Sequence, residues 1–156
     1  MKLHSLLTED LVLLDMKAPD KDKALSEMAA FLKKKDKVGK EKDLFEKLLQ
    51  REGLGSTAIG EGFAIPHCKV KGIKKPVLML GISKPGITFD SIDGKLTHVF
   101  FLVISSPDSP SQNLQILAAV AQLVRKAPTL QKRLLEAHTP QSALKTLREE
   151  EEKPND

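Results

Sequence analysis

A chain of 156 residues with 40% hydrophobic content fits one globular domain of ordinary size and leaves too little length for two. Lysine and arginine exceed aspartate and glutamate by 25 to 21, but the two signs alternate along the helical stretches, and tryptophan and tyrosine are absent, which disfavours nucleic-acid binding. The single cysteine cannot form an internal disulfide, and no apolar run is long enough to span a membrane, so we expect a cytoplasmic protein with neither nucleic acid nor a membrane as partner.

The N-terminal third of the chain predicts one short strand followed by two helices. An apolar run bounded by acids predicts the strand at 10–15. Over 18–38 apolar residues recur every three or four positions, which predicts a helix that Asp20 can cap. A second helix is predicted from Lys40 to Glu52, and the glycines of the following REGLG sequence end it.

The central third predicts extended structure. The stretch 56–67, STAIGEGFAIPH, is glycine-spaced, and Pro66 has no amide hydrogen to extend a ladder, so a strand is expected to stop there and His67 to follow its end. Two further strands are predicted at 75–84 and 97–106, and the continuous apolar run of the second is typical of a strand covered on both faces. Pro-Gly and Asp-Gly turn signals lie between them.

The C-terminal third predicts only helices. A long helix at 109–127 carries apolar residues on most sides, so we expect it to be central, and two shorter helices follow at 128–138 and 139–151. The segment 150–156 is charged and low in apolar content, and we expect it to be a disordered tail. Residues 1–149 are therefore predicted to form a single α/β domain, a sandwich of a mixed β-sheet flanked by helices.

The candidate reactive group is the histidine of AIPHCK, His67. The chain has four histidines, at 4, 67, 98 and 138, and no two share the spacing of metal ligands, so no metal site is predicted. The sequence contains no G-x-S-x-G elbow and no glycine motif for a nucleotide. Two nucleophiles remain, the thiol of Cys68 and the imidazole of His67, and a lone cysteine is more often a small buried apolar group.

The residues upstream of His67 favour phosphoryl chemistry. A neutral imidazole is a good nucleophile for a phosphoryl group, provided that nearby donors hold the phosphoryl oxygens. Arg51 offers a fork of donors, and Ser56 and Thr57 offer hydroxyls, across the chain reversal that precedes the histidine. As alternatives, Arg51 could interact with the end of its own helix, and the two hydroxyl residues could be ordinary turn residues.

The stretch 51–69, REGLGSTAIGEGFAIPHCK, resembles the phosphorylation-site signature of the mannitol/fructose class of enzyme IIA domains in the bacterial phosphoenolpyruvate-dependent sugar phosphotransferase system. The nitrogen-regulatory branch resembles it most closely. The similarity continues through GITFDSIDG at 86–94, VFFLVISSP at 99–107 and the long helix that follows. The fold of that family is an α/β sandwich with a mixed sheet, which agrees with the fold predicted from the elements.

The resemblance implies a role for each residue of the signature. His67 is expected to carry the phosphoryl group, Arg51 to steady the phosphoryl oxygens, and Ser56 and Thr57 to line the site. The phosphoryl donor is expected to be an HPr-like phosphocarrier protein, and the next partner a IIB domain or a regulatory target protein. No cofactor is expected.

One position departs from the pattern of many relatives, which carry a second histidine at the start of the long helix. Here that position is Asn113, which can donate a hydrogen bond to a phosphoryl oxygen but cannot become cationic. We expect a phosphocarrier, and the absence of a IIB or membrane segment from the sequence favours the regulatory branch. The alternatives are a IIA component for fructose or mannitol uptake, an interaction module whose site has decayed, and an enzyme that uses Cys68.

Overall fold

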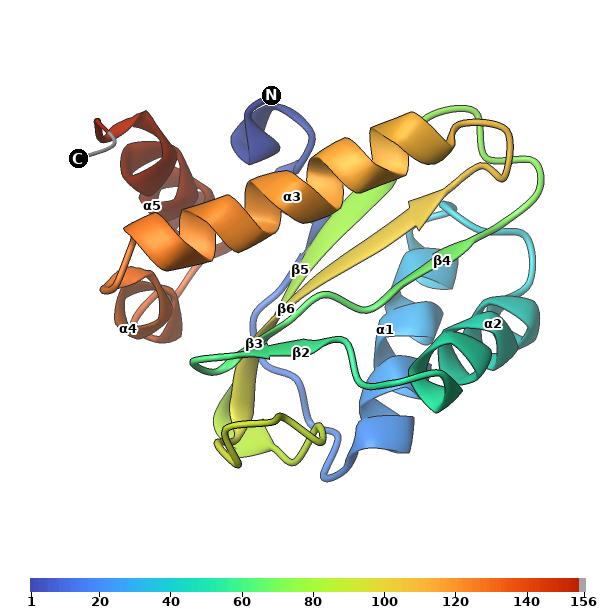
Figure 1. The fold of residues 1–156 in the computed structure, drawn as a ribbon, viewed down its shortest axis with the longest axis horizontal. Helices are drawn as coiled ribbons and strands as arrows, with labels where there is room; N and C mark the ends of the chain where they lie inside the picture. The colour runs from blue at the N-terminus through green and yellow to red at the C-terminus, as the bar shows by residue number, and fades with distance from the viewer. Residues whose placement is uncertain (155–156) are drawn as a thin grey trace.

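The computed structural model describes residues 1–154, which form one mixed β-sheet with helices on both faces (Figure 1). The strands are β1 (Val12–Leu13), β2 (Ala58–Gly60), β3 (Phe63–Ala64), β4 (His67–Lys69), β5 (Val77–Ile87) and β6 (Thr97–Ser105). The helices are α1 (Lys21–Lys34), α2 (Glu41–Gly53), α3 (Pro110–Lys126), α4 (Leu130–Leu135) and α5 (Pro140–Glu152), with short 3-10 helices η1 (Leu3–Ser5) and η2 (Glu9–Leu11). The α/β sandwich with a mixed sheet is confirmed.

The long antiparallel pair β5 and β6 forms the centre of the sheet. The strand order is β1-β5-β6-β3-β2, and β4 also pairs with β6, beyond β3. β1 is parallel to β5, and both β3 and β4 are parallel to β6, whereas β2 is antiparallel to β3. Along β6 every residue except His98 is buried, which confirms a strand covered on both faces.

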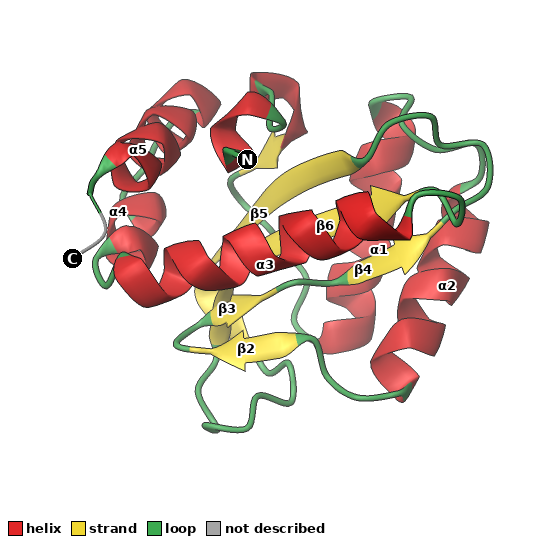
Figure 2. Cartoon of the chain, turned by 45° about the horizontal axis from the view of Figure 1, so that its top comes forward, coloured by secondary structure: helices red, strands yellow, loops and turns green. Residues whose placement is uncertain are grey.

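Two layers of helices cover this sheet. Figure 2 shows α3 crossing one face, with α1 and α2 behind the sheet. Asp20 caps α1 as predicted, because its carboxylate accepts a hydrogen bond of 2.9 Å from the Lys23 amide. On α3, Ile116 and Val120 are buried against the sheet, but the apolar side chain of Leu114 is 65% exposed, so the helix is not buried on all of its apolar sides. None of the described helices is both long and apolar enough to cross a bilayer.

The segment that leads to His67 differs from the single extended stretch that the sequence predicted. It folds into a hairpin of β2 and β3 with Glu61 and Gly62 at the turn, and Gly62 has the positive φ of 86° that favours glycine. Pro66 interrupts the ladder as expected, but its carbonyl accepts a 2.9 Å hydrogen bond from the Val103 amide, so the chain stays beside β6. His67 therefore begins a new strand, β4, rather than a loop.

The charged C-terminal segment is more ordered than the sequence predicted. Helix α5 continues to Glu152, and the side chains of Glu150 and Glu151 are 2% and 5% exposed. Glu150 binds Arg133 at 3.0 Å, and Glu151 accepts hydrogen bonds from the amides of Leu3 and His4 at 2.6 and 2.8 Å. The prediction of a disordered tail from 150 is wrong as far as 152, because these partners lie far away in the sequence. Residues 155–156 lie outside the described residues.

Candidate functional site

His67 lies at the first position of β4, where its backbone pairs in register with Val103 of β6. Its imidazole is half-buried, and its Nδ1 lies 2.8 Å from the carbonyl oxygen of Ile65. A carbonyl oxygen only accepts hydrogen bonds, so Nδ1 carries the proton of the neutral ring. The lone pair of the neutral ring is therefore on Nε2.

Arg51, in the last turn of α2, contacts that second nitrogen. Its Nε donates a hydrogen bond of 3.2 Å to Nε2 of His67, and one of its terminal nitrogens donates to the carbonyl oxygen of Gly55 at 2.9 Å. Gly55 has a φ of 146°, a backbone conformation that favours glycine and turns the chain back toward the guanidinium. The structure thus brings together the two residues that the sequence singled out first.

The surroundings of His67 favour the neutral ring. Burial lowers the pKa of His67 below its ordinary value, and the charge of Arg51 lowers it further. The hydrogen bond to Ile65 and the charge of Glu52 act on the pKa in the opposite direction but do not reverse the shift. An imidazole with a lowered pKa is a free nucleophile over a wider range of pH.

This shift predicts the pH dependence of the site. A histidine with an unperturbed pKa of about 6.5 is half protonated at that pH, whereas His67 should still be mostly neutral there. We expect its ring to titrate at a midpoint below 6.5 in an NMR titration, and its nucleophilic form to be lost only as the pH falls through that lower value. A midpoint at or above the unperturbed value would contradict the environment described here.

The hydroxyls of Ser56 and Thr57 are already engaged within the protein. The Ser56 hydroxyl donates to the carbonyl oxygen of Phe89 at 2.6 Å and accepts from the Ala58 amide at 3.1 Å. Thr57 is 5% exposed, and its hydroxyl donates to the carboxylate of Glu52. Both hydroxyls therefore hold the loop before β2, which is the alternative reading that the sequence left open.

Asn113 lies in the first turn of α3 and is 7% exposed. Its Oδ1 is buried and has no hydrogen-bond partner among the described residues. Within residues 1–154, no hydrogen bond joins Asn113 to Arg51 or His67. A buried amide oxygen without a donor is uncommon, and it leaves the Asn113 side chain free to bind a further polar group.

Sequence reasoning missed two charged residues beside the site, Glu52 and Lys21. The Glu52 carboxylate is 9% exposed and accepts from the Thr57 amide at 3.0 Å, and the Lys21 ammonium lies 2.9 Å from the same oxygen. Lys21 begins α1, far from Glu52 in the sequence. The only sequence signal for Glu52 was its position next to Arg51. Successive residues of a helix point in different directions, so when Arg51 faces the site, Glu52 can face the interior.

Cys68 shows no sign of a reactive thiol. Its side chain is buried, and burial raises the pKa of the thiol to about 12. Because the thiolate is the nucleophile, a pKa this far above that of an ordinary cysteine leaves very little reactive form at neutral pH. The structure therefore does not support the alternative of an enzyme that uses Cys68 as its nucleophile.

We accordingly expect Cys68 to resist alkylation in the folded protein. With a pKa of about 12 instead of an ordinary value near 8.5, the thiolate fraction at neutral pH falls by roughly three thousandfold. Iodoacetamide labelling followed by intact mass should give rapid modification in denaturant and almost none without it. Rapid labelling of the native chain would contradict the buried, protonated thiol.

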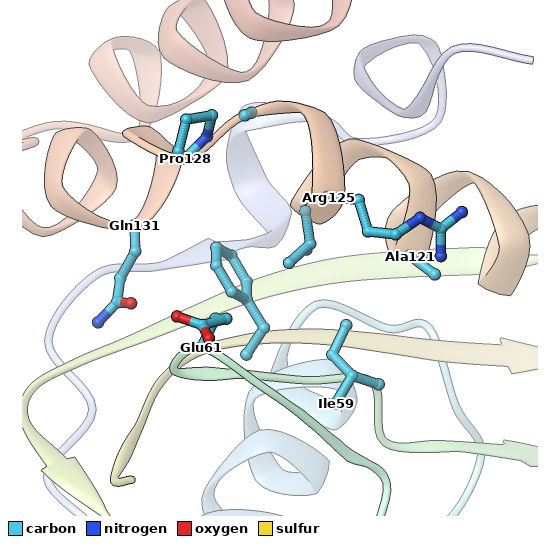
Figure 3. A pocket seen from close by; sticks show the side chains of 9 residues that line it. Ile59, Glu61, Ala121, Arg125, Pro128 and Gln131 are labelled. Carbon is cyan, nitrogen blue, oxygen red and sulfur yellow. The ribbon is translucent and has the colours of Figure 1, made fainter. Parts of the chain in front are cut away.

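His67 does not line the cavity beside the β2–β3 hairpin. A cavity of about 440 Å³ lies between the β2–β3 hairpin and the C-terminal half of α3 (Figure 3). Neither Arg51 nor His67 is among its lining residues, which are Ile59, Glu61, Phe63, Ala121, Val124, Arg125, Ala127, Pro128 and Gln131. Among the described residues, no group of three His, Cys, Asp or Glu side chains is arranged to hold a metal ion.

Comparisons of the sequence with known proteins agree with the resemblance of the signature. The family model described as "Phosphoenolpyruvate-dependent sugar phosphotransferase system, EIIA 2" matches residues 5–150. A nitrogen regulatory protein of Bradyrhizobium diazoefficiens is 37% identical over 127 residues, which cover 80% of this chain and 81% of that protein. The fructose-specific EIIABC component of Bacillus subtilis is 32% identical over 139 residues, 89% of this chain, but the chain spans only 22% of that protein's length.

Solved structures share the fold. The nitrogen regulatory protein IIA-Ntr from Neisseria meningitidis superposes with a TM-score of 0.84 at 25% identity, covering 93% of this chain and 98% of that one. Enzyme IIA for mannitol from Escherichia coli, solved in complex with phosphorylated enzyme IIB, gives a TM-score of 0.76 at 19% identity, covering 92% and 99%, and shows the fold alone. Because the family model matches nearly the whole chain, the protein belongs to the EIIA 2 family of the phosphoenolpyruvate-dependent sugar phosphotransferase system and is a phosphotransferase-type protein.

Proposed function

We propose that His67 accepts a phosphoryl group on Nε2 from a phosphohistidine of an HPr-like phosphocarrier protein. The contact between Arg51 and His67 is the observation that supports this proposal most directly. It sets a guanidinium, the side chain best suited to bind phosphoryl oxygens, against the nitrogen that carries the lone pair. The lowered pKa of His67 keeps that lone pair available at neutral pH.

The transfer step follows from these contacts. The Nε2 lone pair attacks phosphorus, the new N–P bond forms, and the bond from phosphorus to the donor histidine breaks with its electron pair returning to the donor imidazole. The Ile65 carbonyl continues to accept the Nδ1 proton, so it stabilises the positive charge that the ring gains. As the phosphoryl group approaches, the Arg51 Nε–H leaves this lone pair and donates to a phosphoryl oxygen instead.

In this proposal Asn113 supplies a further contact to the phosphoryl group. Its buried side chain has an oxygen without a partner, and the NH2 group of an asparagine can donate a hydrogen bond to a phosphoryl oxygen. An asparagine remains neutral, so it orients the group without adding the positive charge that a second histidine could supply. Ser56 and Thr57 act on the site through the loop that they hold, and not as direct ligands.

We infer that the partners on both sides of the transfer are proteins. The half-exposed imidazole lies on β4 and not in the 440 Å³ cavity that could enclose a small molecule. The donor is an HPr-like protein, and the acceptor is a IIB domain or a regulatory target. The regulatory role is favoured by the nitrogen regulatory relative, which this chain matches over 80% of its own length and 81% of that protein.

The test is reconstitution with phosphoenolpyruvate, enzyme I and HPr, followed by intact mass measurement and mapping of the modified residue. We expect one acid-labile phosphoryl group, on His67. Omitting HPr is the control, and it should abolish the modification. No added phosphate on the wild-type chain, with a IIA domain of known activity phosphorylated alongside, would favour the alternative of an interaction module. Transfer onward to an added fructose or mannitol IIB domain would favour the sugar-uptake role.

A further inference from the structure

The buried carboxylate of Glu52 is fully occupied by contacts to two other segments. Its Oε1 accepts from the Thr57 amide at 3.0 Å and lies 2.9 Å from the Lys21 ammonium, while its Oε2 accepts from the Thr57 hydroxyl. Glu52 is 9% exposed, and a carboxylate at such a site is costly unless it is paired and hydrogen-bonded. These contacts fix the loop after α2 to the end of that helix.

From Thr57 to the imidazole, two further hydrogen bonds follow, joined by the backbone of Thr57 and Ile65. The Thr57 carbonyl oxygen accepts from the Ile65 amide at 3.0 Å, and the Ile65 carbonyl oxygen lies 2.8 Å from Nδ1 of His67. The residue after Ile65 is a proline, so the Ile65 carbonyl has little freedom to turn once its amide is held. This carbonyl accepts the Nδ1 proton and, together with the Arg51 Nε–H that donates to Nε2, sets which ring nitrogen of His67 carries the proton.

Lys21 holds the same loop from a second side. Besides Glu52, its ammonium contacts the Asp90 carboxylate at 3.3 Å and lies 4.6 Å from the centre of the Phe89 ring. The Phe89 carbonyl in turn accepts from the Ser56 hydroxyl at 2.6 Å. Figure 1 shows that the C-terminal end of α2 leads directly into this loop and that α1 lies beside α2. The loop is therefore tied to both helices behind the sheet.

We propose that Glu52 is a positioning residue for His67, which through Thr57 and Ile65 keeps the ring in the tautomer with its lone pair on Nε2. Glu52 does not touch the phosphoryl group. Its effect on the transfer rate rests on the function proposed above, but its effect on the ring does not. A loosened loop would allow the Ile65 carbonyl to turn, and the Arg51 Nε–H alone would then favour this tautomer, so a larger share of the other tautomer would be populated.

The experiment compares Glu52→Ala and Glu52→Gln with the wild type by two measurements. The first is the 15N chemical shifts of the His67 ring in the unphosphorylated protein, which report the tautomer. The second is the rate of phosphorylation by the reconstituted donor system. For Glu52→Ala we expect a mixture of tautomers and a rate lower by about 10- to 100-fold, the loss typical of a reacting group displaced by about 1 Å.

Glu52→Gln should restore part of both signals, because its amide oxygen can still accept from the Thr57 backbone, whereas its NH2 group can no longer accept from the Thr57 hydroxyl and the charge beside Lys21 is lost. Glu46→Ala is the matched control, an exposed glutamate on the same helix, and it should change neither signal. Wild-type tautomer and rate in folded Glu52→Ala would overturn the proposal. If the wild type accepts no phosphate, the function proposed above fails, but the ring spectra still decide the role of Glu52.

A second variant is needed because Glu52→Ala leaves the Lys21 charge without its closest partner and could prevent folding. Thr57→Val removes only the hydroxyl link and keeps the volume of the side chain. For Thr57→Val the proposal requires a smaller change in the tautomer ratio of His67 and a smaller loss of phosphorylation rate. A slower transfer with an unchanged ring spectrum would instead mean that Thr57 binds the phosphoryl group directly, and it would overturn the proposed relay through Thr57.

Discussion

Glutamine in place of His67 is expected to abolish phosphate uptake in the reconstituted system. The glutamine amide is close in size to imidazole, but its nitrogen has no lone pair available to attack phosphorus. Removing the nucleophile should therefore lower the rate by at least about 10³-fold, to below the detection limit of intact mass measurement. The measurement is the fraction of chains that carry one phosphoryl group after incubation with phosphoenolpyruvate, enzyme I and HPr.

The matched control is His138→Gln, because His138 is an exposed histidine at the surface. This variant should accept phosphate at the wild-type rate. Thermal melting of both variants would show that the loss at position 67 does not come from unfolding. Acid-labile phosphate on His67→Gln would move the acceptor to another residue, and the contact between Arg51 and His67 would then require another explanation.

The sequence was sufficient to predict the fold class and most of the helices because these signals are local. The Asp20 cap, the apolar periods of α1 and α2 and the continuous apolar run of β6 each reflect physical preferences within a short window. The order of the strands in the sheet could not be predicted in this way. Nothing in a short window shows that β3 and β4 both pair with β6, since that pairing depends on the register of residues far apart in the chain.

The residues of the candidate site also differ in whether the sequence could predict them. His67 and Arg51 belong to one contiguous signature, so sequence reasoning could name both before any contact was known. The Lys21–Glu52 pair could not be named, because it joins the start of α1 to the end of α2. The same signature placed the Thr57 hydroxyl beside the phosphoryl group, whereas the structure engages it with Glu52. A hydroxyl's partner depends on tertiary packing, which no residue pattern specifies.

Alanine in place of Arg51 is expected to slow phosphate uptake by about 10²- to 10³-fold, which corresponds to roughly 2.7–4 kcal/mol of transition-state stabilisation. The guanidinium is held by the Gly55 carbonyl and already lies at Nε2 of His67, so it has only to pass its Nε–H contact from that nitrogen to a phosphoryl oxygen. Its charge also lowers the pKa of the ring, and the His67 midpoint should therefore rise in Arg51→Ala. A phosphorylation time course measures the loss of rate, and an NMR titration of the His67 ring measures the change in midpoint.

Arg51→Lys separates charge from geometry. A lysine restores the positive charge, so the His67 midpoint should return toward its wild-type value. A single ammonium cannot reproduce the planar fork that binds the Gly55 carbonyl and a phosphoryl oxygen together, so the rate should recover only in part. Arg148→Ala removes an exposed arginine on α5 and should leave both measurements unchanged. Phosphorylation of Arg51→Ala at the wild-type rate would show that the guanidinium only closes the end of α2, the structural role that a late helical arginine commonly has.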